Sequence, residues 1–146
     1  MLEKLELEGK VIVITGGGTG LGRAMGRSLA RAGADLVIAG RRTGPIEEAR
    51  DEFLSLGSKS IAVATDVTDS QQVDHLISTA IAELGRIDVL INNAGGGTAA
   101  KPIWEITDQE WKSGIDTNLS SAFYCSRSVM QHMVDRGNGR IINVAS

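Results

Sequence analysis

The sequence predicts an α/β protein built on a parallel, doubly wound β-sheet. Short apolar runs rich in Val and Ile alternate with longer segments whose apolar residues recur at helical spacing, and the first run leads into a glycine cluster. Nearly continuous apolar runs are typical of strands that are covered on both faces. Strands that alternate with helices favour right-handed crossovers and a parallel sheet. The expected strands are residues 11–14, 36–39, 61–64, 89–91 and 141–144.

The first apolar run is followed directly by a glycine-rich turn at residues 15–22. An apolar pattern at helical spacing begins inside this turn, with Leu21, Met25 and Leu29 on one face. A strand, a turn without side chains and a helix N-terminus together form an anion site, because backbone N–H groups point outward and the helix dipole favours negative charge. The turn therefore predicts a site for the pyrophosphate of a dinucleotide, with a strand–helix connection that binds no ligand as the alternative.

The later helices carry their own start and stop signals. These are a proline in a first turn, an apolar stripe ended by a glycine, a capping box and a Gly-Asn-Gly turn. They predict helices over residues 45–56, over residues 70–84, from the capping box at residues 107–110, and over residues 118–135.

Composition and charge are those of an ordinary globular protein. The chain has 146 residues, of which 42% are hydrophobic, 23% charged and 3% aromatic, with a net charge of −3. A nucleic-acid surface would show a basic excess and stacking aromatics, and neither is present. The N-terminus is charged, unlike a signal peptide, and no apolar run approaches the roughly 20 residues of a membrane span. We expect one domain over residues 1–146, located in the cytoplasm, with neither nucleic acid nor membrane as a partner.

The single cysteine and the two histidines show no catalytic or metal-binding pattern. Cys125 lies among apolar residues of a helical segment, which indicates a small buried side chain. Neither His75 nor His132 has a second histidine or a cysteine at ligand spacing, so no metal site is expected.

In a doubly wound sheet, ligands bind at the carboxyl ends of the strands. Gly40, Arg41 and Arg42 follow the second strand, where a carboxylate would bind the adenosine ribose hydroxyls and repel a 2′-phosphate. Two guanidinium groups can instead hold a phosphate in bidentate fashion. The pair favours NADP(H), with a solvated basic turn as the alternative.

Two more polar segments end neighbouring strands. Asp66, before Val67, ends the third strand, where its carboxylate either accepts the adenine amino group or forms a turn. Asn92 and Asn93 end the fourth strand and can satisfy loop backbone, while Gly95 allows a cofactor to approach.

Together these segments resemble the short-chain dehydrogenase/reductase family. The resemblance rests on residues 15–22, which fit the motif T-G-x-x-x-G-x-G, on residues 66–67, 92–95 and 139–146, and on Asn118. They occur in the order and spacing of the family and cover nearly the whole chain. The resemblance implies a Rossmann-type fold with strand order 3-2-1-4-5, and hydride transfer between a nicotinamide cofactor and a carbonyl or hydroxyl substrate.

The resemblance also implies roles for individual residues. Asn118 is similar to the asparagine that holds a water in a proton relay, and Ser146 to the serine whose hydroxyl binds the substrate oxygen. Thr19 stands where many NADP-using relatives carry a basic residue, so NADP(H) is the favoured cofactor and NAD(H) the alternative. The expected cofactor-binding residues are Thr15, Gly16, Gly18, Thr19, Gly20, Leu21, Gly22, Arg41, Arg42, Asp66, Val67, Asn93, Ala94 and Gly95.

Members of the family carry a Tyr-x-x-x-Lys pair beyond that serine, with the tyrosine as acid and base. This sequence stops at Ser146, and its one tyrosine, Tyr124, has Ser128 four residues later in place of a lysine. We therefore expect an enzyme domain that is incomplete at its C-terminal end and inactive alone.

Two alternatives stay open, together with an expectation about assembly. The chain could be a dinucleotide-binding module without catalysis, or a structural remnant that dimerises through its long helix. A homo-oligomer, either a dimer or a tetramer, is expected. The apolar residues proposed for pairing on that helix are Phe123, Val129, Met130 and Met133.

Overall fold

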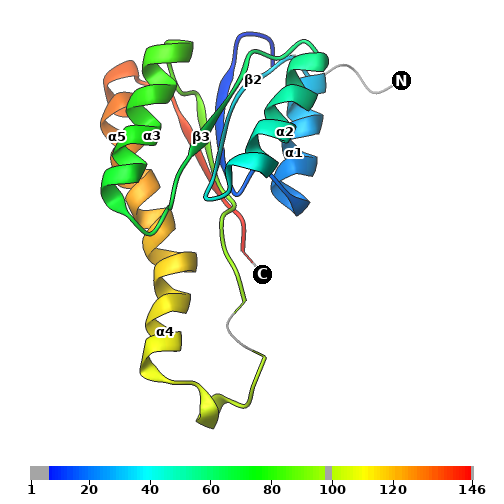
Figure 1. Ribbon diagram of the computed structural model, residues 1–146. Coiled ribbons are helices and arrows are strands. Elements are labelled where there is room, and N and C mark those ends of the chain that lie inside the picture. The colour runs from blue at the N-terminus through cyan, green and yellow to red at the C-terminus, as the bar shows by residue number, and fades with distance from the viewer. Residues whose placement is uncertain (1–6, 98–99, 146) are drawn as a thin grey trace.

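A computed structural model describes residues 7–97 and 100–145, in which a five-stranded sheet carries helices on both faces (Figure 1). The strand order is β3-β2-β1-β4-β5 and every pair is parallel, which confirms the order predicted from the sequence. The strands are β1 (Val11–Thr15), β2 (Asp35–Gly40), β3 (Ser60–Ala64), β4 (Val89–Asn92) and β5 (Arg140–Asn143). The helices are α1 (Gly20–Arg31), α2 (Thr43–Ser55), α3 (Ser70–Leu84), α4 (Asp108–Ile115) and α5 (Ser121–Arg136), with two short segments, η1 (Ile103–Glu105) and η2 (Asp116–Ser120).

The sheet separates two apolar cores, because successive residues of a strand point to opposite faces. Val11 and Val13 of β1 pack into the core under α3 and α5. Ile12 and Ile14 pack into the core under α1 and α2. All four are at most 2% exposed, so β1 is buried on both faces and its end is a fixed point at the centre of the sheet.

Helix α1 approaches the sheet most closely through small residues, and of the expected apolar face Met25 and Leu29 pack against the core while Leu21 does not. Leu21 is 59% exposed, and Met25 and Leu29 are only partly buried. The buried residues of α1 are Gly22, Gly26 and Ala30. A Cβ added at Gly26 would lie 2.6 Å from the Phe53 ring of α2, so the two helices meet at a distance that only glycine allows.

The helix expected over residues 118–135 is the second half of a longer one. Helix α4, the π-helical segment η2 and α5 follow one another without a break. The helix starts at the predicted capping box, in which Thr107 and Glu110 each accept a hydrogen bond from the other's backbone N–H. It ends at Gly137, whose φ of 65° is left-handed. Asn118 is therefore inside a helix, in a π-helical turn of the kind that is frequent at functional sites.

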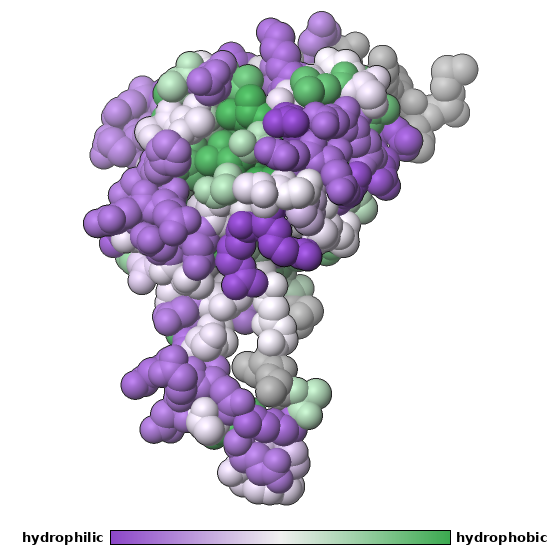
Figure 2. Space-filling view, viewed as in Figure 1, coloured by the Kyte–Doolittle hydropathy of each residue, from purple (hydrophilic) through white to green (hydrophobic). Residues whose placement is uncertain are grey.

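The long helix carries part of the chain away from the body. Helix α4 and the loop after β4 form an arm that leaves at the carboxyl ends of the strands (Figure 1). On the face shown in Figure 2 the surface of this arm is largely hydrophilic. Among residues 7–97 and 100–145, no helix is both long enough and apolar enough to cross a membrane.

A buried carboxylate fixes the opposite end of the sheet. Asp88 is 5% exposed and accepts hydrogen bonds from the Val11 N–H (2.9 Å), Arg86 Nε (2.9 Å) and Arg136 Nη2 (3.0 Å). Burial acts to raise the pKa of this carboxyl, but the Val11 N–H and the two guanidinium groups outweigh it and lower the pKa below its ordinary value. Asp88 thus joins the starts of β1 and β4 to the end of α5.

We expect Asp88→Asn to lower the free energy of unfolding at pH 7 by about 1–3 kcal/mol, because it removes two ion pairs from a buried carboxylate. The folded pKa lies below the unfolded value of about 3.9, so the carboxylate stabilises fully above that value, and the stabilisation is lost as the pH falls through the folded pKa. Urea unfolding should show the two proteins converging below about pH 4. Glu83→Gln, on the exposed surface of α3, is the control, and a pH-independent gap for Asp88→Asn would contradict the assignment.

Candidate functional site

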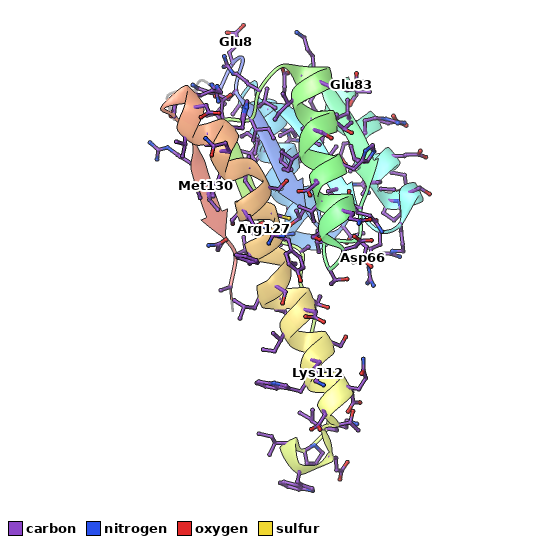
Figure 3. The ribbon with its side chains drawn as sticks, turned by 90° about the vertical axis from the view of Figure 1, so that its left-hand side faces the viewer. Glu8, Asp66, Glu83, Lys112, Arg127 and Met130 are labelled. Atoms are coloured by element: carbon purple, nitrogen blue, oxygen red, sulfur yellow. The ribbon has the colours of Figure 1, made fainter. Side chains whose placement is uncertain are left out.

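The carboxyl ends of the strands surround a cavity of about 470 Å³. Asp66 lies at this end of the body, where the arm begins, while Glu8 and Glu83 lie at the other end (Figure 3). The cavity is lined by residues that follow β1, β2, β3 and β4, and by one face of α4 and η2. Its volume lies in the range of about 300–1,000 Å³ that is usual for small-molecule sites.

Most residues predicted from the sequence to bind a cofactor meet at this cavity. Those that line it are Gly16, Gly18, Thr19, Arg41, Arg42, Asp66, Val67, Ala94 and Gly95. Thr15, Gly20, Leu21, Gly22 and Asn93 do not line it, but they belong to the same two strand-end segments. Ser146 lies outside the described residues.

The glycine turn exposes backbone where side chains would block it. Gly16 and Gly20 have φ values of 64° and 51°, in the left-handed region that favours glycine. A Cβ on Gly22 would lie 2.2 Å from the Gly16 carbonyl oxygen, so α1 can close on the turn only without a side chain there. Thr19, the residue before α1, makes no side-chain cap hydrogen bond. The first N–H groups of α1 therefore have no side-chain acceptor and suit an anion.

Hydrogen bonds between the ends of β1 and β4 hold this turn in place. The Thr15 hydroxyl oxygen accepts the N–H groups of Asn93 (3.0 Å) and Ala94 (3.0 Å). The Asn93 side-chain amide donates in return to the carbonyl oxygens of Thr15 (3.1 Å) and Gly16 (3.2 Å). The nitrogen of Asn93 is therefore engaged with the glycine turn, and this side chain acts by positioning the turn.

The residues after β2 bring positive charge to the cavity. Arg41 and Arg42 are both exposed, and α2 begins at Thr43 immediately after them. In the described part of the chain, neither guanidinium group lies within ion-pair distance of a carboxylate. Two such groups beside the N-terminus of a helix favour an anion at this corner.

Asp66 is oriented by its own turn. Its Oδ1 accepts the hydroxyl (2.7 Å) and the backbone N–H (2.9 Å) of Thr68. These two bonds lower the pKa of Asp66 against the opposing effect of its partial burial, and the charge of Arg41 lowers it further. The carboxylate is thus ionised near neutral pH and stands beside Arg41 at the cavity wall.

Asn118 lies beside the cavity on the side of the arm, next to Thr117, but does not itself line it. Its Nδ2 donates to the carbonyl oxygens of Gly96 (2.8 Å) and Gly114 (3.0 Å), and its Oδ1 accepts the Gly96 N–H (3.1 Å). A Cβ on Gly95 would lie 2.7 Å from that same oxygen. Asn118 therefore fastens the loop after β4 to the π-helical turn, at the mouth of the cavity.

The sequence reading missed the wall formed by the long helix. Gln109, Ser113, Asp116 and Thr117 line the cavity from one helical face. Their spacing of three to four residues is the available signal, and it becomes visible once the helix predicted from the capping box is known to continue without a break through residue 117.

Two other sequence interpretations concern reactive groups. Burial raises the pKa of the Cys125 thiol to about 12, which fits an unreactive thiol packed in the core and not a nucleophile. Tyr124 is partly buried in the core under α5, with the Arg127 guanidinium 5.5 Å from its ring centroid, and it does not line the cavity. Within residues 7–97 and 100–145, no three His, Cys, Asp or Glu side chains cluster as metal ligands.

Comparison with known proteins identifies the family. The model of the short chain dehydrogenase family matches residues 10–146, and the chain belongs to this family. A 1,6-dihydroxycyclohexa-2,4-diene-1-carboxylate dehydrogenase from Acinetobacter baylyi is 38% identical over 139 residues, which cover 95% of this chain and 53% of that protein. The chain spans about half the length of the curated relatives that it matches.

Solved structures share the fold. A 7α-hydroxysteroid dehydrogenase, complexed with NADH and 7-oxo glycochenodeoxycholic acid, superposes with a TM-score of 0.92 at 33% identity, covering 98% of this chain and 55% of that one. A metagenomic short-chain oxidoreductase in complex with NADP gives a TM-score of 0.90 at 30% identity, covering 99% of this chain and 64% of that one.

We expect Gly22→Ala to destabilise the protein by about 3 kcal/mol or more, because the new methyl group overlaps the Gly16 carbonyl and forces α1 away from the turn. Urea unfolding followed by circular dichroism measures the effect. Gly44→Ala is the matched control: a Cβ there meets no atom within 4 Å, and the change should be neutral or stabilising by up to about 1 kcal/mol. Equal stability of the two variants would contradict the close approach of Gly22 to the Gly16 carbonyl.

Proposed function

We propose that this chain is the cofactor-binding part of a cytoplasmic, NADP(H)-dependent oxidoreductase that transfers hydride between the nicotinamide and a carbonyl or hydroxyl substrate. The observation that supports this most is the convergence of three features on one cavity. These are the glycine turn with uncapped α1 N–H groups, the pair Arg41 and Arg42, and the polar ends of β3 and β4. Membership of the short chain dehydrogenase family agrees with this reading.

The residues present fit a dinucleotide. The backbone of Gly16, Gly18 and Thr19 would hold the pyrophosphate, since side chains are absent where it must approach. Asp66 and Val67 would meet the adenine, and Ala94 and Gly95 the central ribose region. The bound cofactor supplies the hydride carrier, and the chain supplies orientation and charge around it.

The proposed choice of NADP(H) depends on Arg41 and Arg42. A 2′-phosphate would satisfy two guanidinium groups that otherwise have no carboxylate at ion-pair distance in the described residues. NAD(H) is the second candidate. Thr19 provides no basic side chain at the turn, and the related structures include one with NADP and one with NADH.

For the chemical step we propose two contributors from this chain. Asn118 would take part in the proton relay by holding the π-helical turn and the Gly96 backbone together beside the cofactor. Ser146 would hydrogen-bond the substrate oxygen. We assign no residue of this chain as the acid or base of the reaction, and we leave the substrate unassigned. We therefore expect the chain to bind the cofactor without turnover.

We expect the chain to bind NADPH, and Arg41→Asp to weaken that binding by about 30-fold or more while changing NADH binding by less than about threefold. The substitution removes one phosphate ligand and adds a repelling charge. Titration of the purified chain followed by reduced-nicotinamide fluorescence gives both affinities. Arg31→Asp, at the exposed far end of α1, is a charge-matched control. Equal losses for NADPH and NADH would show that Arg41 does not read the 2′-phosphate.

We also propose that the chain self-associates through the outward face of α5. Of the residues expected from the sequence, Val129 and Met133 are buried on the chain's own sheet, whereas Phe123 and Met130 are 55% and 45% exposed. Met130 lies toward the β5 edge of α5, where it lines a surface hollow with Met133 and with Ile141 of β5. Val134, one turn after Met130, extends the exposed apolar surface. Such a face on a single chain is typical of an interface.

Light scattering should therefore give a mass above that of one chain for the wild type, and a lower mass for Met130→Glu, which places a charge in the centre of the apolar face. Gln71→Glu adds the same charge at an exposed polar position of α3 and should leave the mass unchanged. A monomeric wild type would contradict the proposal.

A further inference from the structure

Helices α1 and α2 both begin at the cavity, and each would present one phosphate subsite. Helix α1 follows Gly18 and Thr19, and α2 follows Arg41 and Arg42, all of which line the cavity. The spacing between the glycine turn and the two arginines is therefore the spacing between the starts of two helices. A ligand with phosphates at both places requires that spacing to be constant.

The two helix starts touch directly. A Cβ on Gly18 would lie 3.0 Å from both the backbone nitrogen and Cγ2 of Ile46, in the first turn of α2. A Cβ on Gly40 would lie 2.8 Å from the same Cγ2. These contacts and the buried side chains of Ile46, Ala49 and Phe53 keep α2 against the sheet, but apolar packing alone does not specify the position of α2 along its axis.

Glu52 restrains α2 by ion pairs to α1, which the apolar contacts do not provide. One oxygen of this α2 carboxylate accepts a hydrogen bond from Arg23 Nε, at 2.9 Å, and the other accepts one from Arg27 Nε. Two successive turns of α1 are therefore bonded to a single side chain of α2. The side chain of Glu52 is only 24% exposed and that of Arg23 only 28%. The hydrogen bond from Arg27, and with it the one from Arg23, lowers the pKa of Glu52 to about 2, so the carboxylate stays charged at all working pH values.

The glycine turn and the arginine pair do not depend equally on the ion pairs of Glu52. The glycine turn is held from the side of β4, by the hydrogen bonds among Thr15, Asn93 and Ala94. Arg41 and Arg42 have no such anchor: they lie between β2 and α2, and Arg42 is the residue that precedes α2. A shift of α2 would move the arginines while the turn stays in place.

We propose that Glu52, through its bonds to Arg23 and Arg27, is a positioning residue that sets the distance between the pyrophosphate turn and the 2′-phosphate arginines, and so determines how strongly the site prefers NADP(H) over NAD(H). The proposal rests on the function proposed above. Glu52 lies outside the cavity lining and touches no ligand group, so its effect on the cofactor is indirect.

The test is the ratio of NADPH to NADH affinity in Glu52→Gln, measured by the same titration on the full chain. The amide cannot accept from both guanidinium groups, so we expect the preference for NADPH to fall about three- to tenfold, with little change in NADH affinity. Arg27→Gln removes one of the two bonds at a residue 41% exposed and should shift the ratio in the same direction by less. Asp51→Asn breaks only the neighbouring pair with Arg50 within α2 and should leave the ratio unchanged.

The outcomes separate this inference from the proposed function. If the wild type binds neither cofactor, or binds both equally, the proposed NADP(H) site is wrong. If the wild type prefers NADPH and Arg41→Asp removes the preference, but Glu52→Gln and Arg27→Gln keep the wild-type ratio, Glu52 is not a positioning residue. Parallel losses of NADPH and NADH affinity in Glu52→Gln, with a lower melting temperature, would assign the network a purely structural role.

Discussion

Thr15 and Asn93 join the two central strands at the edge of the sheet where the glycine turn begins. The Thr15 hydroxyl holds the chain leaving β4, and the Asn93 amide holds the chain leaving β1. Because β1 is buried on both faces, these bonds transmit the rigidity of the core to the glycine-rich turn. The cavity keeps its shape because this turn is tied to the buried central strand.

Glycine serves this site in two different ways. At Gly16 and Gly20 it permits left-handed backbone, and at Gly22, Gly26 and Gly95 it permits close approach. Gly22 allows α1 to pack against the turn, Gly26 allows α1 to pack against α2, and Gly95 allows the loop after β4 to pack against Asn118. The same residue type therefore shapes the turn, the α1–α2 contact and the loop after β4, while the charged residues of the cavity lining are Arg41, Arg42, Asp66 and Asp116.

The sequence was sufficient for the sheet, because its buried strands are continuous apolar runs, and for α3, whose ends are fixed locally by the Asp69 cap and by Gly85. The sequence was not sufficient where the structure depends on contacts between segments that are distant in the chain. Glycine is required at position 26 of α1 because the Phe53 ring of α2 lies opposite, and no pattern within α1 shows that. The helix of the arm was predicted from its capping box, but its continuity with the next helix was missed because Asn118 resembles a helix start, whereas its side chain bonds to Gly96, twenty-two residues earlier. The helical face that lines the cavity was missed with that continuity.

The central claim is that this cavity holds a nicotinamide dinucleotide phosphate. Backbone amide NMR of the labelled chain during titration with NADPH tests it residue by residue. We expect the shifts to concentrate at residues 16–22, 40–46, 65–68 and 93–97, and NADH to leave the second group much less affected. Shifts located elsewhere on the chain, or none at saturating cofactor, would contradict the claim.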